Sequence, residues 1–190
     1  MTVVIIDYGS GNLRSAAKAF ERAASAAGSK IRVTDSATDI AHATRIVLPG
    51  VGAFGACAKG LRAVPGMVAA MEERVLEGGA PFLGVCVGMQ LMAETGEEFG
   101  EHAGLGWVSG KVAAIPPAPG LRVPHMGWND VVPSRPHPLI EAGEAYFLHS
   151  FAFSGAHVIA TSDHGGPVTA AIGRDNMVGV QFHPEKSQRY

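Results

Sequence analysis

The chain has 190 residues, of which 47% are hydrophobic and 17% are charged, and its formal net charge is −2. A chain of this length buries about 70% of its unfolded surface when it folds, so no disulfide or structural metal is required. The balanced charge excludes the basic surface that binds nucleic acids or anionic membranes. We expect a single domain over residues 1–190.

No membrane span and no export signal is predicted. The apolar run at residues 3–6 has no basic segment before it, and the run at residues 80–93 is interrupted by Pro81 and two glycines. A spanning helix needs about 20 apolar residues. The two cysteines, Cys57 and Cys86, are too few for a disulfide framework, and Cys57 is expected to be an inert buried thiol. We therefore expect a cytoplasmic protein.

Strand and helix patterns alternate in the first half of the chain. Continuous apolar runs predict strands over residues 2–7, 31–34, 45–48 and 81–85. Helices are predicted over residues 13–26, over residues 66–77 and from residue 89 to residue 94. Strands separated by helices form a parallel sheet with right-handed crossovers.

In the second half, turns rather than helices separate the predicted strands. These strands cover residues 107–115, 129–132, 145–148, 158–162, 169–172 and 177–182. The sequence therefore predicts an α/β fold, a mostly parallel twisted sheet flanked by helices with added antiparallel strands. His125 and Trp128 are expected in a glycine-containing turn, where Trp128 is either a core residue or an anchor for a partner.

One motif between a strand and a helix carries a cysteine. Gly84-Val85-Cys86-Val87-Gly88 has the pattern of a nucleophile elbow, a strained turn that exposes its central side chain at the edge of a sheet. The start of the following helix stabilises a thiolate through its partial positive charge. The alternative is a buried structural cysteine in a glycine-rich turn.

A second motif supplies a base. Residues 179–185, Gly-Val-Gln-Phe-His-Pro-Glu, predict a strand ending at His183, and Pro184 keeps that residue extended. Residues i and i+2 share a face, so Glu185 can orient the His183 imidazole. With Cys86 these residues form a triad of nucleophile, base and orienting group. The alternative is an ordinary surface turn.

A third motif is the loop Pro49-Gly50-Val51-Gly52-Ala53-Phe54-Gly55. Its glycines allow backbone N–H groups to turn toward a developing negative charge, and the N–H of Val87 is a second candidate donor. A flexible loop and a phosphate cradle are the alternatives. The phosphate cradle is disfavoured because no Gly-Lys-Ser/Thr follows.

Taken together, these three motifs resemble the class I (triad-type) glutamine amidotransferases. Within that family the loop at 49–55 and three further segments are similar to the glutaminase subunits of imidazole glycerol phosphate synthases. The three segments are Pro124-His125-Met126-Gly127-Trp128-Asn129, Phe147-Leu148-His149-Ser150-Phe151 and Glu185-Lys186-Ser187. The resemblance spans essentially the whole chain and implies a three-layer, flavodoxin-like fold. Members usually continue after these residues with a helix that packs on the sheet, so we expect one sheet face to be less covered here.

The resemblance also implies an activity. Cys86, His183 and Glu185 would hydrolyse glutamine, and the ammonia would pass to a (β/α)8-barrel cyclase of histidine biosynthesis. The N–H groups of Val51 and Val87 would hold the oxyanion, after a peptide of the loop has reoriented. Glutamine would be bound by Gly52, Gln90, Glu98, Ser150 and Phe151, and the cyclase would be contacted by Trp128 and Lys186.

Two other functions are compatible with the residues. A stand-alone cysteine hydrolase could act on γ-glutamyl or peptide substrates with the same triad. A non-catalytic binding module could have kept only the fold, although the intact triad argues against it. No cofactor is predicted, and no metal site, since the sequence has no Cys-x-x-Cys and no His-x-x-x-His pair.

Overall fold

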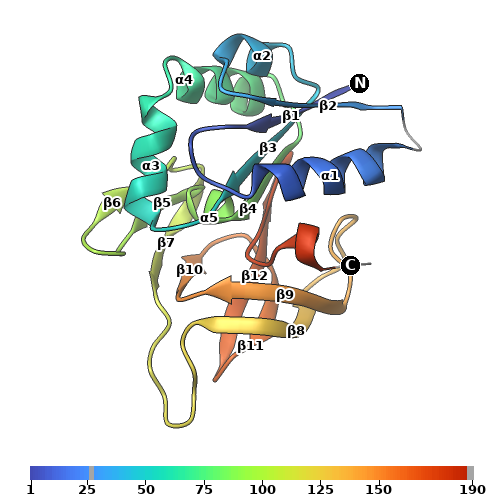
Figure 1. Ribbon diagram of the computed structural model, residues 1–190. Coiled ribbons are helices and arrows are strands. Elements are labelled where there is room, and N and C mark those ends of the chain that lie inside the picture. Colours follow the sequence, from blue (N-terminus) through green and yellow to red (C-terminus); the bar gives the residue numbers. More distant parts are fainter. Residues whose placement is uncertain (26–27, 188–190) are drawn as a thin grey trace.

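The computed structural model describes residues 1–25 and 28–187 (Figure 1). Its strands are β1 (Thr2–Ile6), β2 (Lys30–Thr34), β3 (Arg45–Gly50), β4 (Phe82–Cys86), β5 (Ala93–Gly96), β6 (His102–Ala103), β7 (Val108–Ala114), β8 (His125–Pro133), β9 (Gly143–His149), β10 (Phe151–Gly155), β11 (Val158–Asp163), β12 (Pro167–Arg174) and β13 (Met177–Val180). Its helices are α1 (Leu13–Ala24), α2 (Ala37–Ala41), α3 (Phe54–Ala63), α4 (Met67–Glu72) and α5 (Val87–Gln90), with a π-helical turn η2 (Glu73–Glu77) and a 3-10 turn η3 (Pro184–Lys186).

The larger sheet has a parallel half and an antiparallel half. Its strand order among the described residues is β2-β1-β3-β4-β13-β12-β11-β8-β9. The five strands β2, β1, β3, β4 and β13 run parallel to one another. The sheet continues with β12, β11, β8 and β9, each antiparallel to its neighbour. The predicted α/β fold, with antiparallel strands added to a parallel core, is confirmed.

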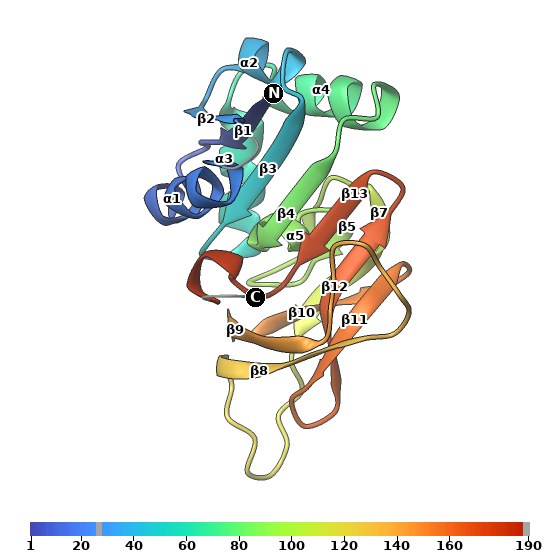
Figure 2. The same ribbon diagram turned by 90° about the vertical axis from the view of Figure 1, so that its right-hand side faces the viewer.

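Apolar strands explain the parallel half. β1 and β3 are buried along almost their whole length, as expected for strands covered by helices on both faces (Figure 2). The predicted helix at residues 13–26 corresponds to α1, and residues 26 and 27 lie outside the described residues. The predicted helix at residues 66–77 corresponds to α4 and the π-helical turn that follows it. Within the described residues no helix has the length and apolarity needed to cross a bilayer.

The helix predicted from residue 89 to residue 94 is wrong. α5 ends at Gln90, and Ala93–Gly96 is a strand that pairs in parallel with β7 in a second sheet of order β10-β7-β5-β6. The chain passes so close to itself here that a Cβ on Gly104 would lie 2.0 Å from the Ala93 carbonyl oxygen. Pairing with β7 therefore overrides the local helix propensity of these residues.

The turn expected around His125 and Trp128 is also wrong, because both residues lie in β8. That strand begins four residues before the predicted start at Asn129 and pairs with β9, with His125 opposite His149. His125 is buried and its ring stacks on Phe147 at 4.6 Å. Trp128 lies three residues after His125. Because side chains alternate along a strand, it points to the opposite face and is exposed.

Candidate active site

The backbone at Cys86 has the strain expected of a nucleophile elbow. Cys86 is the last residue of β4 and has φ of +55° and ψ of −114°, which a non-glycine residue rarely adopts. A Cβ on Gly88 would lie 1.8 Å from the Leu48 carbonyl oxygen, and one on Gly84 would lie 2.7 Å from the Gly88 carbonyl oxygen. Side chains at either of these glycines would therefore collide with neighbouring backbone.

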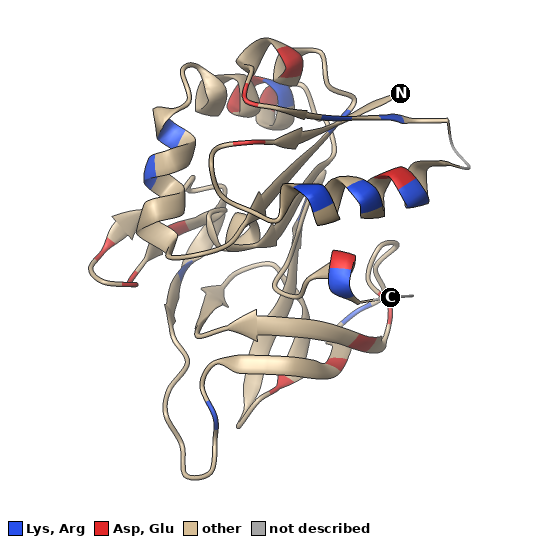
Figure 3. Cartoon of the chain, viewed as in Figure 1, with Lys and Arg blue, Asp and Glu red and all other residues tan. Residues whose placement is uncertain are grey.

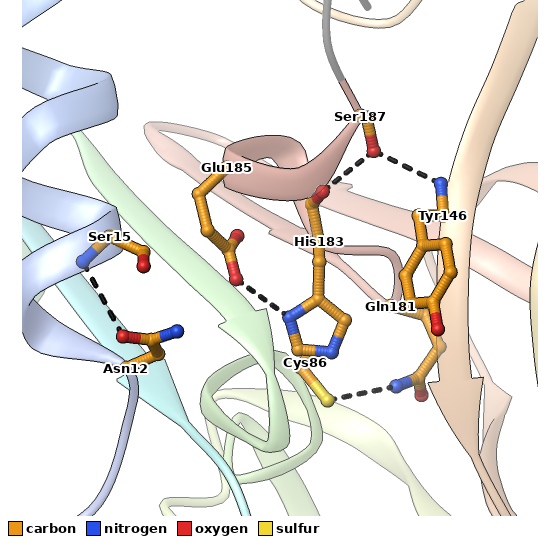
Figure 4. Close-up of polar contacts among 8 residues, drawn as sticks. All are labelled: Asn12, Ser15, Cys86, Tyr146, Gln181, His183, Glu185 and Ser187. Atoms are coloured by element: carbon orange, nitrogen blue, oxygen red, sulfur yellow. Dashed lines mark hydrogen bonds and ion pairs between the residues drawn. The ribbon is translucent and has the colours of Figure 1, made fainter.

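The structure brings His183 and Glu185 beside this cysteine. The Nδ1 of His183 is 2.9 Å from a carboxylate oxygen of Glu185, and Figure 4 shows the imidazole between that carboxylate and the Cys86 sulfur. Ser187 holds the backbone in place, because its hydroxyl donates to the His183 carbonyl at 2.6 Å and accepts the N–H of Tyr146 at 3.0 Å. Glu185 thus holds the imidazole of His183, and Ser187 holds its backbone carbonyl.

Electrostatics favour the charged forms of this pair. Burial alone would lower the pKa of His183, but hydrogen bonds to Cys86 and Glu185 and the charges of both raise this pKa to about 9. Burial would raise the pKa of Glu185, yet the neighbouring His183 lowers it below its usual range. An imidazolium next to the sulfur can stabilise a thiolate and can later donate a proton.

Gln181 is a residue that the sequence analysis did not single out. It is fully buried, its amide nitrogen is 3.8 Å from the Cys86 sulfur, and its amide oxygen accepts a hydrogen bond of 3.0 Å from Gln90. The signal that could have found it is its spacing of two residues from His183 on an extended chain. Its amide donates toward the nucleophile and stabilises negative charge there.

The two candidate oxyanion donors, the N–H groups of Val87 and Val51, differ in whether they already have a hydrogen-bond partner. Val87 is the first residue of α5, so its N–H has no partner within that helix. The N–H of Val51 instead donates to the Ser10 hydroxyl at 3.2 Å, and the Val51 carbonyl accepts from Ser10 at 2.5 Å and from Cys57 at 3.4 Å. Val51 must leave Ser10 before its N–H can face the sulfur. Gly52, with φ of +102° and open space around it, gives the loop freedom to do so.

A pocket of about 440 Å³ opens onto Cys86. Glu98 lies in its wall, and its carboxylate accepts the N–H of Phe54 at 2.8 Å. Among the described residues, no cluster of three or more His, Cys, Asp or Glu side chains is arranged to hold a metal ion. The predicted residues that line the pocket are Val51, Gly52, Cys86, Val87, Gln90, Glu98, Ser150, Phe151, His183 and Lys186.

Comparisons with known proteins agree with this geometry. Residues 4–190 match the glutamine amidotransferase class-I family. The chain belongs to the class I glutamine amidotransferases. It is 56% identical to imidazole glycerol phosphate synthase subunit HisH of Zymomonas mobilis, over all of this chain and 91% of that protein. It is 54% identical to the subunit of the same name from Brucella suis, over 99% of this chain and 93% of that protein.

Solved structures show the same fold at low sequence identity. A crystal structure of a glutamine amidotransferase superposes with a TM-score of 0.73 at 20% identity, over 96% of this chain and 90% of that chain. A glutamine amidotransferase from Thermotoga maritima gives a TM-score of 0.67 at 16% identity, over 97% of this chain and 76% of that chain. The three-layer fold expected for this amidotransferase is confirmed.

An apolar face of the amidotransferase lies next to the pocket. On β8 and β9 the exposed side chains of Met126, Trp128 and Leu148 stand near Tyr146, whose ring meets Trp128 edge-on at 6.2 Å. The ammonium of Lys186 lies 5.6 Å from the centre of the Tyr146 ring, close enough for a cation–π contact. Figure 3 shows no Lys or Arg on either strand, and each strand carries one exposed acidic residue further along, Asp130 and Glu144. Trp128 and Lys186, the two predicted partner residues, thus both contact Tyr146 and lie on the same surface. Tyr146 was not predicted from the sequence.

We predict that Gly88→Ala destabilises the amidotransferase by more than about 4 kcal/mol, or prevents folding, because its methyl group would meet the fixed Leu48 carbonyl. Gly106→Ala is the matched control. It places a methyl group in open space at φ of +70°, so conformational strain alone should cost about 1–2 kcal/mol. Urea unfolding of both variants measures the difference. Equal losses would contradict the steric explanation.

We predict that Glu185→Gln lowers the pKa of His183 from about 9, because the variant loses the carboxylate charge that favours the imidazolium. NMR titration of the His183 ring measures this shift, and kcat/KM for glutamine should fall by about 10²-fold, the low end of the range for general acid–base catalysis. Glu144→Gln, at an exposed position of β9, is the control and should leave the titration unchanged. An unaltered His183 titration in Glu185→Gln would remove the carboxylate from its assigned role.

Proposed function

We propose that this amidotransferase is the glutaminase subunit of an imidazole glycerol phosphate synthase and acts in the cytoplasm. It would hydrolyse glutamine to glutamate and ammonia, and the ammonia would pass to a cyclase subunit of histidine biosynthesis. The observation that carries the proposal is the identity of 51–56% over essentially the whole chain to proteins of that name.

Acylation begins at the sulfur. The Cys86 thiolate attacks the side-chain amide carbon of glutamine, and the oxygen becomes negatively charged. The N–H of Val87 stabilises this oxyanion, and the N–H of Val51 joins it once it has left Ser10. The His183 imidazolium then gives its proton to the departing nitrogen, so that ammonia leaves and a γ-glutamyl thioester remains.

Deacylation uses the same groups in the reverse order. The neutral His183 now takes a proton from a water molecule that attacks the thioester, and glutamate is released. The step restores the Cys86 thiolate and the His183 imidazolium. Glu185 holds the imidazole in one orientation through both steps, since its carboxylate bonds Nδ1 and leaves Nε2 for the reaction.

The pocket offers complementary groups for glutamine. Both hydrogens of the Gln90 amide nitrogen are used, by the Phe151 carbonyl and by Gln181, which leaves its amide oxygen as an acceptor for a ligand N–H. That oxygen and the Glu98 carboxylate suit an α-ammonium group. Backbone N–H groups of Gly52, Ser150 and Phe151 suit an α-carboxylate.

The cyclase is the partner in this proposal, and we expect a (β/α)8 barrel. Trp128 and Lys186 would contact it, because a half-exposed tryptophan in an apolar face next to a cation is typical of an interface hot spot. Docking there would cover the edge of the sheet where Cys86 lies, so ammonia could reach the cyclase without entering bulk water.

We predict that Cys86→Ala abolishes glutamine-dependent synthesis but leaves synthesis from added ammonium salts intact, because Cys86 serves only the release of ammonia. Both reactions are measured on the complex with the cyclase. His183→Ala should lose nearly as much glutamine-dependent activity, since triad members act as a unit. Loss of the ammonia-dependent reaction in an assembled complex would contradict this division of labour.

We predict that glutamine hydrolysis is slow in the isolated subunit and rises by about 10²–10³ when the cyclase and its ligand are bound. That range corresponds to one oxyanion donor, about 3–4 kcal/mol, which Val51 cannot supply while it is bonded to Ser10. Glutamate formation is measured for the subunit alone, with the cyclase, and with the cyclase and its ligand. Equal full rates in all three would favour the stand-alone cysteine hydrolase.

A further inference from the structure

Two buried histidines connect β8 to the wall of the glutamine pocket. The amide nitrogen of Asn129 lies 2.9 Å from Nε2 of His125, and Nδ1 of His125 lies 3.0 Å from Nε2 of His149. Nδ1 of His149 lies 2.8 Å from the carbonyl oxygen of Phe151. These three contacts form one continuous hydrogen-bond chain.

The two ends of the chain determine its direction. The Asn129 amide nitrogen also donates to the Asp163 carbonyl at 2.8 Å, and its amide oxygen accepts the N–H of Asp130, so the orientation of this amide is set by its partners. An amide nitrogen only donates and a carbonyl only accepts. His125 and His149 must therefore each be neutral, with the hydrogen on Nδ1 and the lone pair on Nε2.

The surroundings keep both rings neutral. Burial, together with the charge that His149 and His164 would carry, lowers the pKa of His125 to about 4. Burial also lowers the pKa of His149 to about 4, and the charges of His164 and His183 act in the same direction. The hydrogen bond to the Phe151 carbonyl would raise this pKa but does not outweigh burial. A proton added to either Nε2 would face a donor and break the chain.

The hydrogen-bond chain ends at the Phe151 carbonyl, which accepts two hydrogen bonds. The Phe151 oxygen also accepts a hydrogen bond of 3.0 Å from Gln90, whose nitrogen bonds Gln181 as well. Ser150, Phe151, His149 and Gln90 all line the pocket at Cys86. One fixed carbonyl therefore sets both the Ser150–Phe151 backbone and the Gln90 side chain.

We propose that His149, supported by His125, is a positioning residue of the glutamine pocket: its Nδ1–H holds the Phe151 carbonyl, and with it Gln90, in the arrangement that binds glutamine. This inference rests on the proposed function. It assigns to His149 an effect on substrate affinity rather than on the chemical step, because the ring nitrogens of His149 bond His125 and the Phe151 carbonyl and not the sulfur or the triad carboxylate.

Two substitutions separate this role from mere filling of space. The side-chain nitrogen of asparagine can replace Nδ1, whereas that of glutamine reaches the position of Nε2. His149→Asn should keep the donor to Phe151 and leave KM for glutamine within about threefold of wild type. His149→Gln keeps more side-chain volume but loses that donor, so we expect KM to rise tenfold or more with kcat within about threefold.

Kinetics are measured on the complex with the cyclase, and glutamine affinity is measured by calorimetry on the subunit in a Cys86→Ser background. Calorimetry does not depend on turnover, so a wild-type complex without glutaminase activity would count against the proposed function and not against this inference. Equal increases in KM for both variants, or a greater loss in His149→Asn, would overturn the positioning role.

A measurement on the wild-type protein covers the case in which a variant does not fold. Nitrogen NMR shifts distinguish the two neutral tautomers, and we expect His125 and His149 both to carry the hydrogen on Nδ1 at pH 7. A hydrogen on Nε2 of His149 would overturn the inference, because the Phe151 carbonyl would then have no donor from that ring.

Discussion

The close pairing of β4 with β3 and β13 is the constraint on which the site depends. Cys86 lies opposite Gly50, and Val85 lies between Pro49 and Val180. Because all three strands are parallel, their carboxyl ends meet at one edge, as is general for ligand sites in open α/β sheets. The loop with Val51, Cys86 and His183 therefore converge there, although they are far apart in the chain.

The two faces of the antiparallel half carry different kinds of side chain. Alternation along β8 sends His125 and Asn129 inward and Met126 and Trp128 outward. The inward residues reach the pocket wall by hydrogen bonds, while the outward Met126 and Trp128 form an apolar patch that ends at the exposed Asp130. One pair of strands thus carries both the support of the substrate pocket and the face suited to a partner.

The buried histidines show how partners decide charge in similar surroundings. His183 has a carboxylate and a sulfur beside it, and its pKa is raised. His125 and His149 have an amide, a carbonyl and each other, and their pKa values are lowered. Desolvation opposes the charge on all three rings, so the raised pKa of His183 comes from the neighbouring carboxylate and sulfur.

Features whose partners are close along the chain could be predicted from the sequence. The alternation of apolar runs predicted the parallel core, the glycines around Cys86 predicted the strained elbow, and the spacing of two residues predicted the contact of His183 with Glu185. Such features rest on backbone periodicity and local sterics, which a short segment already contains. The resemblance to a family then predicted residues that line the pocket at Cys86.

Contacts between distant segments could not be predicted from the sequence and depend on how the chain packs. Residues 93–96 became a strand because β7 lies beside them, and Val51 is bonded to Ser10, 41 positions away. Gln90 meets Gln181 across 91 positions, and His125 meets His149 across 24. The physical reason is that a buried polar group takes whichever partner the packed chain brings within hydrogen-bond distance, and no local pattern encodes that partner.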